Sequence, residues 1–282
     1  MKTLLALVAI TVTAAGSVSN VAPARDIEVI GVDYAFQIPS TLPAGRTTFH
    51  FRNSGKKQHE FNILLLKEGT KPEQFFQAVK ANQPQMIMVD EPVGVLFAEP
   101  GKVGAYGLTT NLVAGRTYVV ICIARDSAKA PRHVEMGMSA ILRVTGSKPG
   151  APLPQTATDT IVGVNYAFKY RGSVAPGRHT FLFRNEGTVR HEAFFGLLKK
   201  GVTLDSLEKV DKAGGNTDAL MESADGLLFS SAGQTPAGTL QIDMPSGREY
   251  VIFCTFADDE KSPPHYKLGM VGSIRVSGVP GS

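Results

Sequence analysis

The sequence predicts an all-β protein made of two β-sandwiches in tandem, each with one short helical insertion. Three observations predict this fold class. The chain repeats itself at a constant offset of 132 residues, so that Ile30 corresponds to Val162. Within each copy, short β-prone runs are separated by turn residues at the intervals typical of a sandwich. Glycine and proline, with 29 and 17 residues among 282, are plentiful and scattered, as turn-rich β folds require.

The constant offset identifies an internal duplication without a net gap. Three segment pairs show it: "IGVDYAF" (30–36) with "VGVNYAF" (162–168), "FRNSGKKQHE" (51–60) with "FRNEGTVRHE" (183–192), and "GRTYVVIC" (115–122) with "GREYVIFC" (247–254). The repeated unit is far longer than the roughly 20–50 residues of solenoid repeats. Each copy is therefore expected to be a whole domain with its own sandwich, and a merger of both copies into one sheet system would contradict this expectation.

Each copy contains several strand candidates and one helix candidate. The strand candidates of copy one are 26–36, 44–53, 59–66, 116–124 and 139–146. Alternating residues in 44–53 indicate a half-buried strand, and the apolar run in 59–66 indicates a fully buried one. The helix candidate is 69–80, with Thr70 as N-cap and Pro72 in the first turn. Segment 201–210 occupies the same place in copy two.

The first 24 residues are predicted to be a signal peptide. Lys2 precedes an apolar run at 4–16, and "APA" at 22–24 is a small-x-small cleavage site. The alternative is a retained membrane anchor, but the run is shorter than the roughly 20 residues that span a bilayer. The expected organisation is a signal peptide (1–24), domain one (25–146), a Pro- and Gly-rich linker (147–157) and domain two (158–282). The mature protein is then periplasmic or secreted.

Composition restricts the partners. The formal net charge is only +4, and the chain has no arginine-rich stripe or basic tail, so nucleic acid is not expected as a partner. No later segment is long and apolar enough for stable membrane insertion. A redox partner protein is compatible with the sequence, and the oligomeric state stays open.

The two cysteines, Cys122 and Cys254, are equivalent residues of the two copies. An exported chain with an even cysteine count suggests a disulfide. Each cysteine, however, lies in a strand in phase with inward-facing residues, and a bridge would bring the two strands within about 7 Å. We therefore expect no disulfide, which leaves either a metal ligand or a plain buried thiol.

Histidine and methionine follow the same repeat. Four of the six histidines obey it, whereas His50 and His179 do not. Each copy thus carries an early His, a Cys, a late His and a Met: His59, Cys122, His133 and Met138, then His191, Cys254, His265 and Met270. Two imidazoles, a thiolate and a weak axial thioether are the ligand set of a blue-copper electron-transfer site.

Each copy resembles a cupredoxin domain over nearly its whole length. The resemblance rests on N-x-G-x-x-x-H before the early histidine, G-x-x-Y-x-x-x-C before the cysteine, and His-x4-Met at the end. It implies two Greek-key sandwiches with one copper ion each. The implied ligands are the two four-residue sets above. Met136 is a rival in copy one, but Leu268 replaces it in copy two, which favours Met138.

Two features depart from the cupredoxin pattern. Ten residues separate the Cys from the late His in both copies, which is longer than in small cupredoxins. In addition, Glu60 and Glu192 directly follow the early histidines. A carboxylate there would shift the potential of the site or replace a ligand, and the sequence leaves this open.

The predicted function is copper binding with electron transfer, without enzyme activity. A copper oxidase would need His-x-His pairs, and a nitrite reductase would need further histidines at a domain interface; only His50 and His179 are unassigned. Two alternatives remain: a copper-free cupredoxin-fold module with a binding or structural role, and a copper handling or storage protein.

Overall fold

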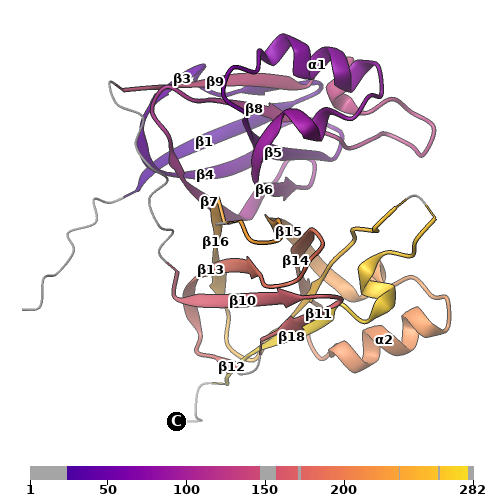
Figure 1. The fold of residues 1–282 in the computed structure, drawn as a ribbon. Helices are drawn as coiled ribbons and strands as arrows, with labels where there is room; N and C mark the ends of the chain where they lie inside the picture. The colour runs from indigo at the N-terminus through magenta and orange to yellow at the C-terminus, as the bar shows by residue number, and fades with distance from the viewer. Residues whose placement is uncertain (1–23, 147–156, 171–172, 235, 260, 279–282) are drawn as a thin grey trace, which may run out of the picture.

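The computed structural model describes residues 24–146, 157–170, 173–234, 236–259 and 261–278. The predicted signal peptide, except Ala24, and the predicted linker, except residue 157, lie outside the described residues. Copy one occupies the upper half of Figure 1 and copy two the lower half. Within the described part of the chain, no helix has the length and apolar character needed to cross a membrane.

Both copies have the same order of elements. Copy one contains β1 (Arg25–Val32), β2 (Ala35–Gln37), β3 (Thr41–Pro43), β4 (Gly45–Asn53), β5 (His59–Leu66), α1 (Pro72–Lys80), η1 (Gln85–Met88), β6 (Val89–Ala98), β7 (Val103–Leu112), β8 (Thr117–Ile121), η2 (His133–Met136) and β9 (Ser139–Thr145). Copy two contains β10 (Asp159–Val164), β11 (Ala167–Lys169), β12 (Ser173–Val174), β13 (Gly177–Asn185), β14 (His191–Leu198), α2 (Leu204–Lys212), η3 (Asp218–Leu220), β15 (Met221–Ser230), β16 (Gly238–Met244), β17 (Glu249–Phe253), η4 (His265–Leu268) and β18 (Val271–Val276). The expected all-β fold with one helical insertion per copy is confirmed.

Two sheets form the sandwich layers. One has the order β11-β10-β13-β16-β7-β4-β1-β2, and the other has the order β12-β18-β17-β14-β15-β6-β5-β8-β9-β3. Both sheets are mixed. In the first, β1 pairs in parallel with β4, and β10 with β13; in the second, β3 pairs in parallel with β9, and β12 with β18. Each sheet contains strands of both copies, so the layers continue from one copy into the other (Figure 1).

The copies meet edge to edge in both layers. In one sheet, β7 pairs with β16, and Leu108 lies opposite Leu240. In the other, β6 pairs with β15, and Val95 lies opposite Leu227. In both pairs the two residues are 132 positions apart, so each is the repeat equivalent of the other. The joint therefore has approximate two-fold symmetry, like the isologous interface of a homodimer.

The expectation of separate sheet systems is wrong, although each copy keeps its own two-layer sandwich. Unpaired strand edges attract further strands, and pairing the edges of the two copies removes four of them. Two glycines of the repeat permit this approach. A Cβ on Gly94 would lie 3.0 Å from the carbonyl oxygen of Leu227, and one on Gly226 would lie 3.1 Å from the carbonyl oxygen of Val95.

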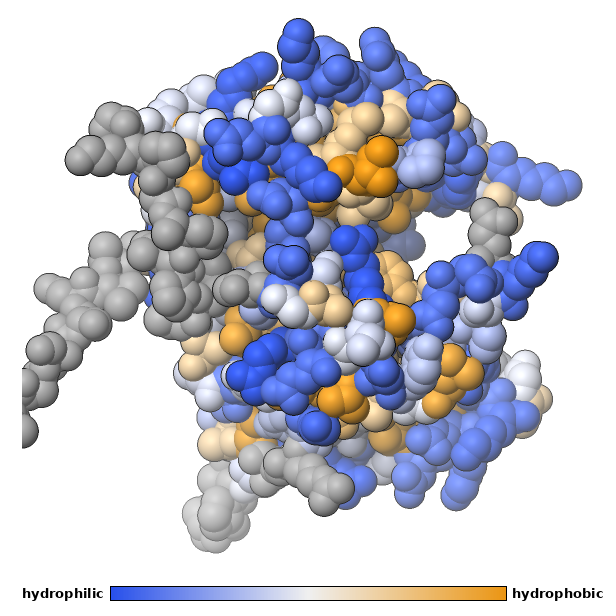
Figure 2. Space-filling model, viewed as in Figure 1, coloured by the Kyte–Doolittle hydropathy of each residue, from blue (hydrophilic) through white to orange (hydrophobic). Residues whose placement is uncertain are grey.

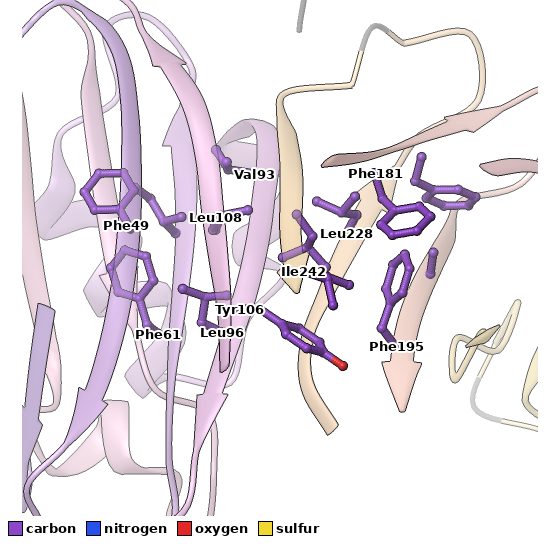
Figure 3. Packing of buried hydrophobic residues seen from close by; sticks show 14 of the residues in the cluster. Phe49, Phe61, Val93, Leu96, Tyr106, Leu108, Phe181, Phe195, Leu228 and Ile242 are labelled. Carbon is purple, nitrogen blue, oxygen red and sulfur yellow. The ribbon is translucent and has the colours of Figure 1, made fainter. Parts of the chain in front are cut away.

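One hydrophobic core runs through both copies. It contains Phe49 and Phe61 of copy one together with Phe181 and Phe195 of copy two. Figure 3 shows Tyr106 between the buried side chains of the two copies. On the face seen in Figure 2, hydrophilic residues predominate and hydrophobic ones form small groups. The continuous core indicates that the joint contributes to the stability of both copies.

The copies differ at their helices. Helix α1 buries Phe75 in a satellite core, whereas α2 has no buried residue. A cavity of about 700 Å³ lies instead beside α2, lined by Leu207, Phe253 and Tyr266 among others. Helix α1 begins at Pro72, and its N-cap is Lys71 rather than the expected Thr70.

We expect copy one, produced alone as residues 25–146, to form a dimer. Removal of copy two exposes β6 and β7, and the self-complementary register lets the same strands of a second molecule replace β15 and β16. Light scattering after gel filtration should give about twice the mass of the fragment, with the intact chain as the reference. A well-folded monomeric fragment would contradict this prediction.

Candidate metal centre

An asparagine loop positions the early histidine at the start of β5. The side-chain amide of Asn53 donates hydrogen bonds to the carbonyl oxygens of Lys57 and Ala98, at 2.7 and 2.9 Å. Its oxygen accepts the backbone N–H of Gly55 at 2.9 Å. Asn185 makes the equivalent set in copy two. The asparagine of the N-x-G-x-x-x-H motif thus holds the loop that leads into β5 in one conformation.

Backbone hydrogen bonds bring Cys122, His133 and Met138 together. The N–H of Cys122 donates to the carbonyl oxygen of Met138 at 3.2 Å, and the N–H of Met138 donates to that of His133 at 2.9 Å. The N–H of His133 donates to the carbonyl oxygen of Ala124 at 2.9 Å. Copy two repeats these bonds through Cys254, Met270, His265 and Phe256. The ten residues between the cysteine and the late histidine therefore form a loop that leaves the Cys, His and Met residues adjacent.

In copy one, three atoms that could bind a metal ion converge. Nδ1 of His59 lies 2.9 Å from Nδ1 of His133. Sγ of Cys122 lies 3.4 Å from Nδ1 of His133 and 3.9 Å from Nδ1 of His59. All three side chains have no solvent exposure. Three potential ligand atoms thus face a single point inside the protein, and we call this group site one.

Copy two reproduces the cluster. The two Nδ1 atoms of His191 and His265 are 3.0 Å apart, and Sγ of Cys254 lies 3.4 Å from His265 and 3.9 Å from His191. We call this group site two. In the described part of the chain, these are the two clusters of His, Cys, Asp or Glu with metal-binding geometry.

The loop between the cysteine and the late histidine supplies a carboxylate to each site. Oδ1 of Asp126 lies 3.1 Å from Nε2 of His133, and its Oδ2 accepts the hydroxyl of Tyr34 at 2.6 Å. Asp258 and Tyr166 make the same contacts with His265, at 3.1 and 2.6 Å. Sequence analysis missed these four residues. Their equivalence within the repeat was visible, but only the fold shows that they reach the histidines.

The early histidines differ between the copies. Oδ1 of Asp33 lies 2.8 Å from Nε2 of His59. Asn165 occupies the equivalent position, but its Oδ1 accepts the backbone N–H of Thr188 at 2.8 Å. Nε2 of His191 is buried and has no hydrogen-bond partner among the described residues.

Burial and neighbouring histidines lower the pKa of both early histidines. For His59, burial lowers the pKa and the bond to Asp33 opposes it. For His191, burial and the nearby His265 lower the pKa to about 4. Both imidazoles are therefore neutral near pH 7, which is the form that binds metal.

The two glutamates after the early histidines turn toward the strand that carries the cysteine. Oε1 of Glu60 accepts the backbone N–H of Ile123 at 3.0 Å, and Oε1 of Glu192 accepts that of Thr255 at 3.0 Å. Burial raises the pKa of Glu60 to about 7. These carboxyl groups brace the backbone next to the cysteine and are not among the clustered ligand atoms.

Both cysteines are free buried thiols. Burial raises the pKa of Cys122 to about 12 and that of Cys254 to about 11. The backbone N–H of Glu60 donates to Sγ of Cys122, and that of Glu192 to Sγ of Cys254, each at 3.4 Å. Ionisation of such a thiol needs a compensating positive charge, and a metal ion is one.

The donor set fits a soft metal ion. In site one, Asp33 and Asp126 each accept a hydrogen bond from the Nε2–H of a histidine. Both Nδ1 atoms therefore carry lone pairs, and they lie 2.9 Å apart. Two facing acceptors beside a sulfur repel one another, and a cation among them removes the repulsion. Thiolate and imidazole ligands select copper or zinc rather than magnesium or calcium.

The methionine candidates differ in burial, and the two histidines outside the repeat lie away from the clusters. Met138 and Met270 are fully buried, whereas Met136 and Leu268 are 38% and 45% exposed. His50 lies beside Asp26 at 3.1 Å, and His179 lies beside Asp159 at 2.8 Å, both outside the two clusters.

Comparisons with known proteins identified structural neighbours. No protein-family model matches the chain, and no curated protein matches its sequence. Among solved structures, auracyanin from Roseiflexus castenholzii is 20% identical and covers 44% of this chain and 100% of its own length, with a TM-score of 0.30. Auracyanin A, a blue copper protein from Chloroflexus aurantiacus, is 19% identical over 44% of this chain and 100% of its own, with a TM-score of 0.29.

A two-domain structure is also similar. Copper nitrite reductase from Nitrosomonas europaea is 14% identical and covers 90% of this chain and 94% of its own, with a TM-score of 0.26. The strand order and the two buried His-Cys-His clusters of this chain agree with the resemblance in its motifs. Two joined β-sandwiches that each carry such a cluster are the fold and the site that the resemblance of each copy to a cupredoxin domain implies.

Proposed function

We propose that the chain is an exported electron carrier that binds one copper ion in each copy. The ligands are His59, Cys122, His133 and Met138 in site one, and His191, Cys254, His265 and Met270 in site two. The copies are two domains, 25–146 and 158–282, that follow a signal peptide at residues 1–24. A redox partner protein then exchanges electrons with at least one site.

One observation carries the proposal: in both copies a thiol and two Nδ1 atoms converge in a buried cluster while carboxylates occupy the outer side of the late histidines. A histidine ligand normally donates its other N–H to such a carboxylate or to a carbonyl, which fixes its tautomer. The two copies have diverged elsewhere, as at their helices, but both retain this arrangement.

Copper supplies a one-electron change between its cuprous and cupric states. The chain's own residues hold the ligands still during that change. The bonds of Cys122 to Met138 and of Met138 to His133 tie three of the four ligand residues together by their backbones. Little rearrangement is then needed when the charge changes, and the burial of the ligands excludes water from the ligand atoms.

The converging donor atoms favour copper binding over a copper-free module. Copper handling would use the same ligands, but the full burial of both histidines in each site favours retention of the ion over its transfer. Storage also needs retention, and the redox behaviour of the bound copper distinguishes it from electron transfer. We propose no enzyme activity, because His50 and His179 contact aspartates outside the clusters.

Titration of the reduced, metal-free protein with Cu(II) tests the copper sites. We expect uptake of two equivalents with an intense visible band, because the thiolate transfers charge to the metal. Cys122→Ser and Cys254→Ser should each retain one equivalent and about half of the band, since each copy closes its own site. Binding of colourless Cu(I) alone would support handling, and no binding would leave the copper-free module.

Substitutions in site one separate the roles of its ligands. Met138→Leu should keep copper bound and shift the potential, because an axial thioether is a weak ligand. His133→Ala should weaken binding by more than the roughly 10–100-fold that loss of a residue behind a ligand costs.

His50→Ala is the matched control, since His50 contacts a surface aspartate and should leave copper affinity unchanged. These affinities are measured by competition with a chelator in the Cys254→Ser background. Unchanged affinity in His133→Ala would refute the ligand assignment.

A further inference from the structure

We infer that the two sites are unequal, with site one binding Cu(II) more tightly and having the lower reduction potential. The difference arises behind the early histidine, where copy one has Asp33 and copy two has Asn165. This inference rests on the proposed function, because it concerns the same copper ligands. Asp33 is a positioning residue for His59, and copy two lacks its counterpart.

Asp33 is held in place by the loop that precedes His59. Its carboxylate accepts the backbone N–H groups of Lys56, at 3.0 and 3.1 Å, and of Lys57, at 3.3 Å. The same oxygen, Oδ1, lies 2.8 Å from Nε2 of His59, so the carboxylate joins the loop to the imidazole. His59 therefore has a fixed ring orientation and a fixed tautomer, with its proton on Nε2.

Asn165 does not accept a hydrogen bond from His191 and so does not fix its ring orientation or tautomer. Its Oδ1 accepts the backbone N–H of Thr188 at 2.8 Å, and its Nδ2 donates to the hydroxyl of Thr188 at 3.1 Å. Thr188 stands where copy one has Lys56, so the two substitutions occur together and turn the amide away from the imidazole. Nε2 of His191 is left buried without a partner among the residues that the structure describes.

This difference gives the metal-free sites different hydrogen bonds. In site one, both histidines carry their proton on Nε2, and two Nδ1 lone pairs face each other at 2.9 Å. In site two, a carboxylate fixes the tautomer of His265 only, through Asp258. His191 therefore carries its proton on Nδ1 and donates a hydrogen bond to Nδ1 of His265, 3.0 Å away. Metal binding relieves repulsion in site one but breaks a hydrogen bond in site two.

Charge acts in the same direction. The carboxylate of Asp33 makes the imidazole of His59 a stronger donor, which stabilises the more highly charged Cu(II). Asp126 and Asp258 are common to both copies and do not distinguish the sites. Lys57 opposes the effect at 3.6 Å from Asp126, but its side chain is 48% exposed and solvent screens its charge. An electron shared by the two sites therefore resides mainly on copy two.

Single-site proteins measure each site separately. Cys254→Ser reports on site one, and Cys122→Ser reports on site two. Chelator competition should give Cu(II) affinity about 10–100-fold higher for site one, and redox titration should give it the lower potential. In these backgrounds, Asp33→Asn should weaken site one by about the same factor and raise its potential, whereas Asn165→Asp should do the opposite in site two.

Two control substitutions accompany Asp33→Asn: one makes the same change of charge elsewhere, and the other changes a residue of the same loop region. Asp26→Asn removes a carboxylate beside the surface histidine His50 and should change neither quantity. Lys57→Val introduces the residue of copy two at that position and should have a much smaller effect than Asp33→Asn.

The outcomes are separable. Equal affinities and potentials, or values that Asp33→Asn and Asn165→Asp leave unchanged, overturn the inference while the copper sites stand. Absence of copper binding in both single-site proteins overturns the proposed function and the inference with it. If Asp33→Asn does not fold, as judged by circular dichroism, Asn165→Asp in site two decides the question, because it introduces a carboxylate instead of removing one.

Discussion

The backbone hydrogen bonds between the cysteine, the late histidine and the methionine are the constraint on which each site depends. Cys122 donates to Met138, and Met138 donates to His133, so the three residues stay adjacent whatever the connecting loop does. Because the loop between Cys122 and His133 does not have to hold these residues together, it can be ten residues long. It places Asp126 against the outer side of His133. The long loop, which departs from the cupredoxin pattern, thereby fixes the tautomer of His133.

The duplication also explains how the copies assemble. Equivalent residues face each other where the sheets join, as Leu108 faces Leu240, so the chain is arranged like a homodimer whose subunits are covalently linked. Linkage removes the need for two copies to remain identical, because each pairs with only one partner. The unequal helices show this freedom, since Phe75 closes a satellite core in copy one and Leu207 lines a cavity in copy two.

The copies also diverge behind the proposed metal ligands, where the change bears directly on the proposed function. Asp33 and Asn165 have the same number of heavy atoms and nearly the same shape. The carboxylate of Asp33 is a charged acceptor for His59, whereas the amide of Asn165 is hydrogen-bonded to Thr188. Two sites with identical donor atoms then differ in the hydrogen bonds and charge around those donors. If both sites bind copper as proposed, this inequality would give electron transfer a direction, which two identical sites would not.

The sequence by itself determined the fold class and the ligand candidates, because both follow from local patterns repeated at one offset. Strand periodicity and the shared His, Cys and Met residues are visible without coordinates. Tertiary structure alone decided the rest. The edge pairing of Val95 with Leu227 depends on main-chain groups, which every residue carries. The contact of Asp33 with His59 spans 26 residues, and whether a carboxylate reaches an imidazole depends on loop geometry that composition and periodicity do not encode.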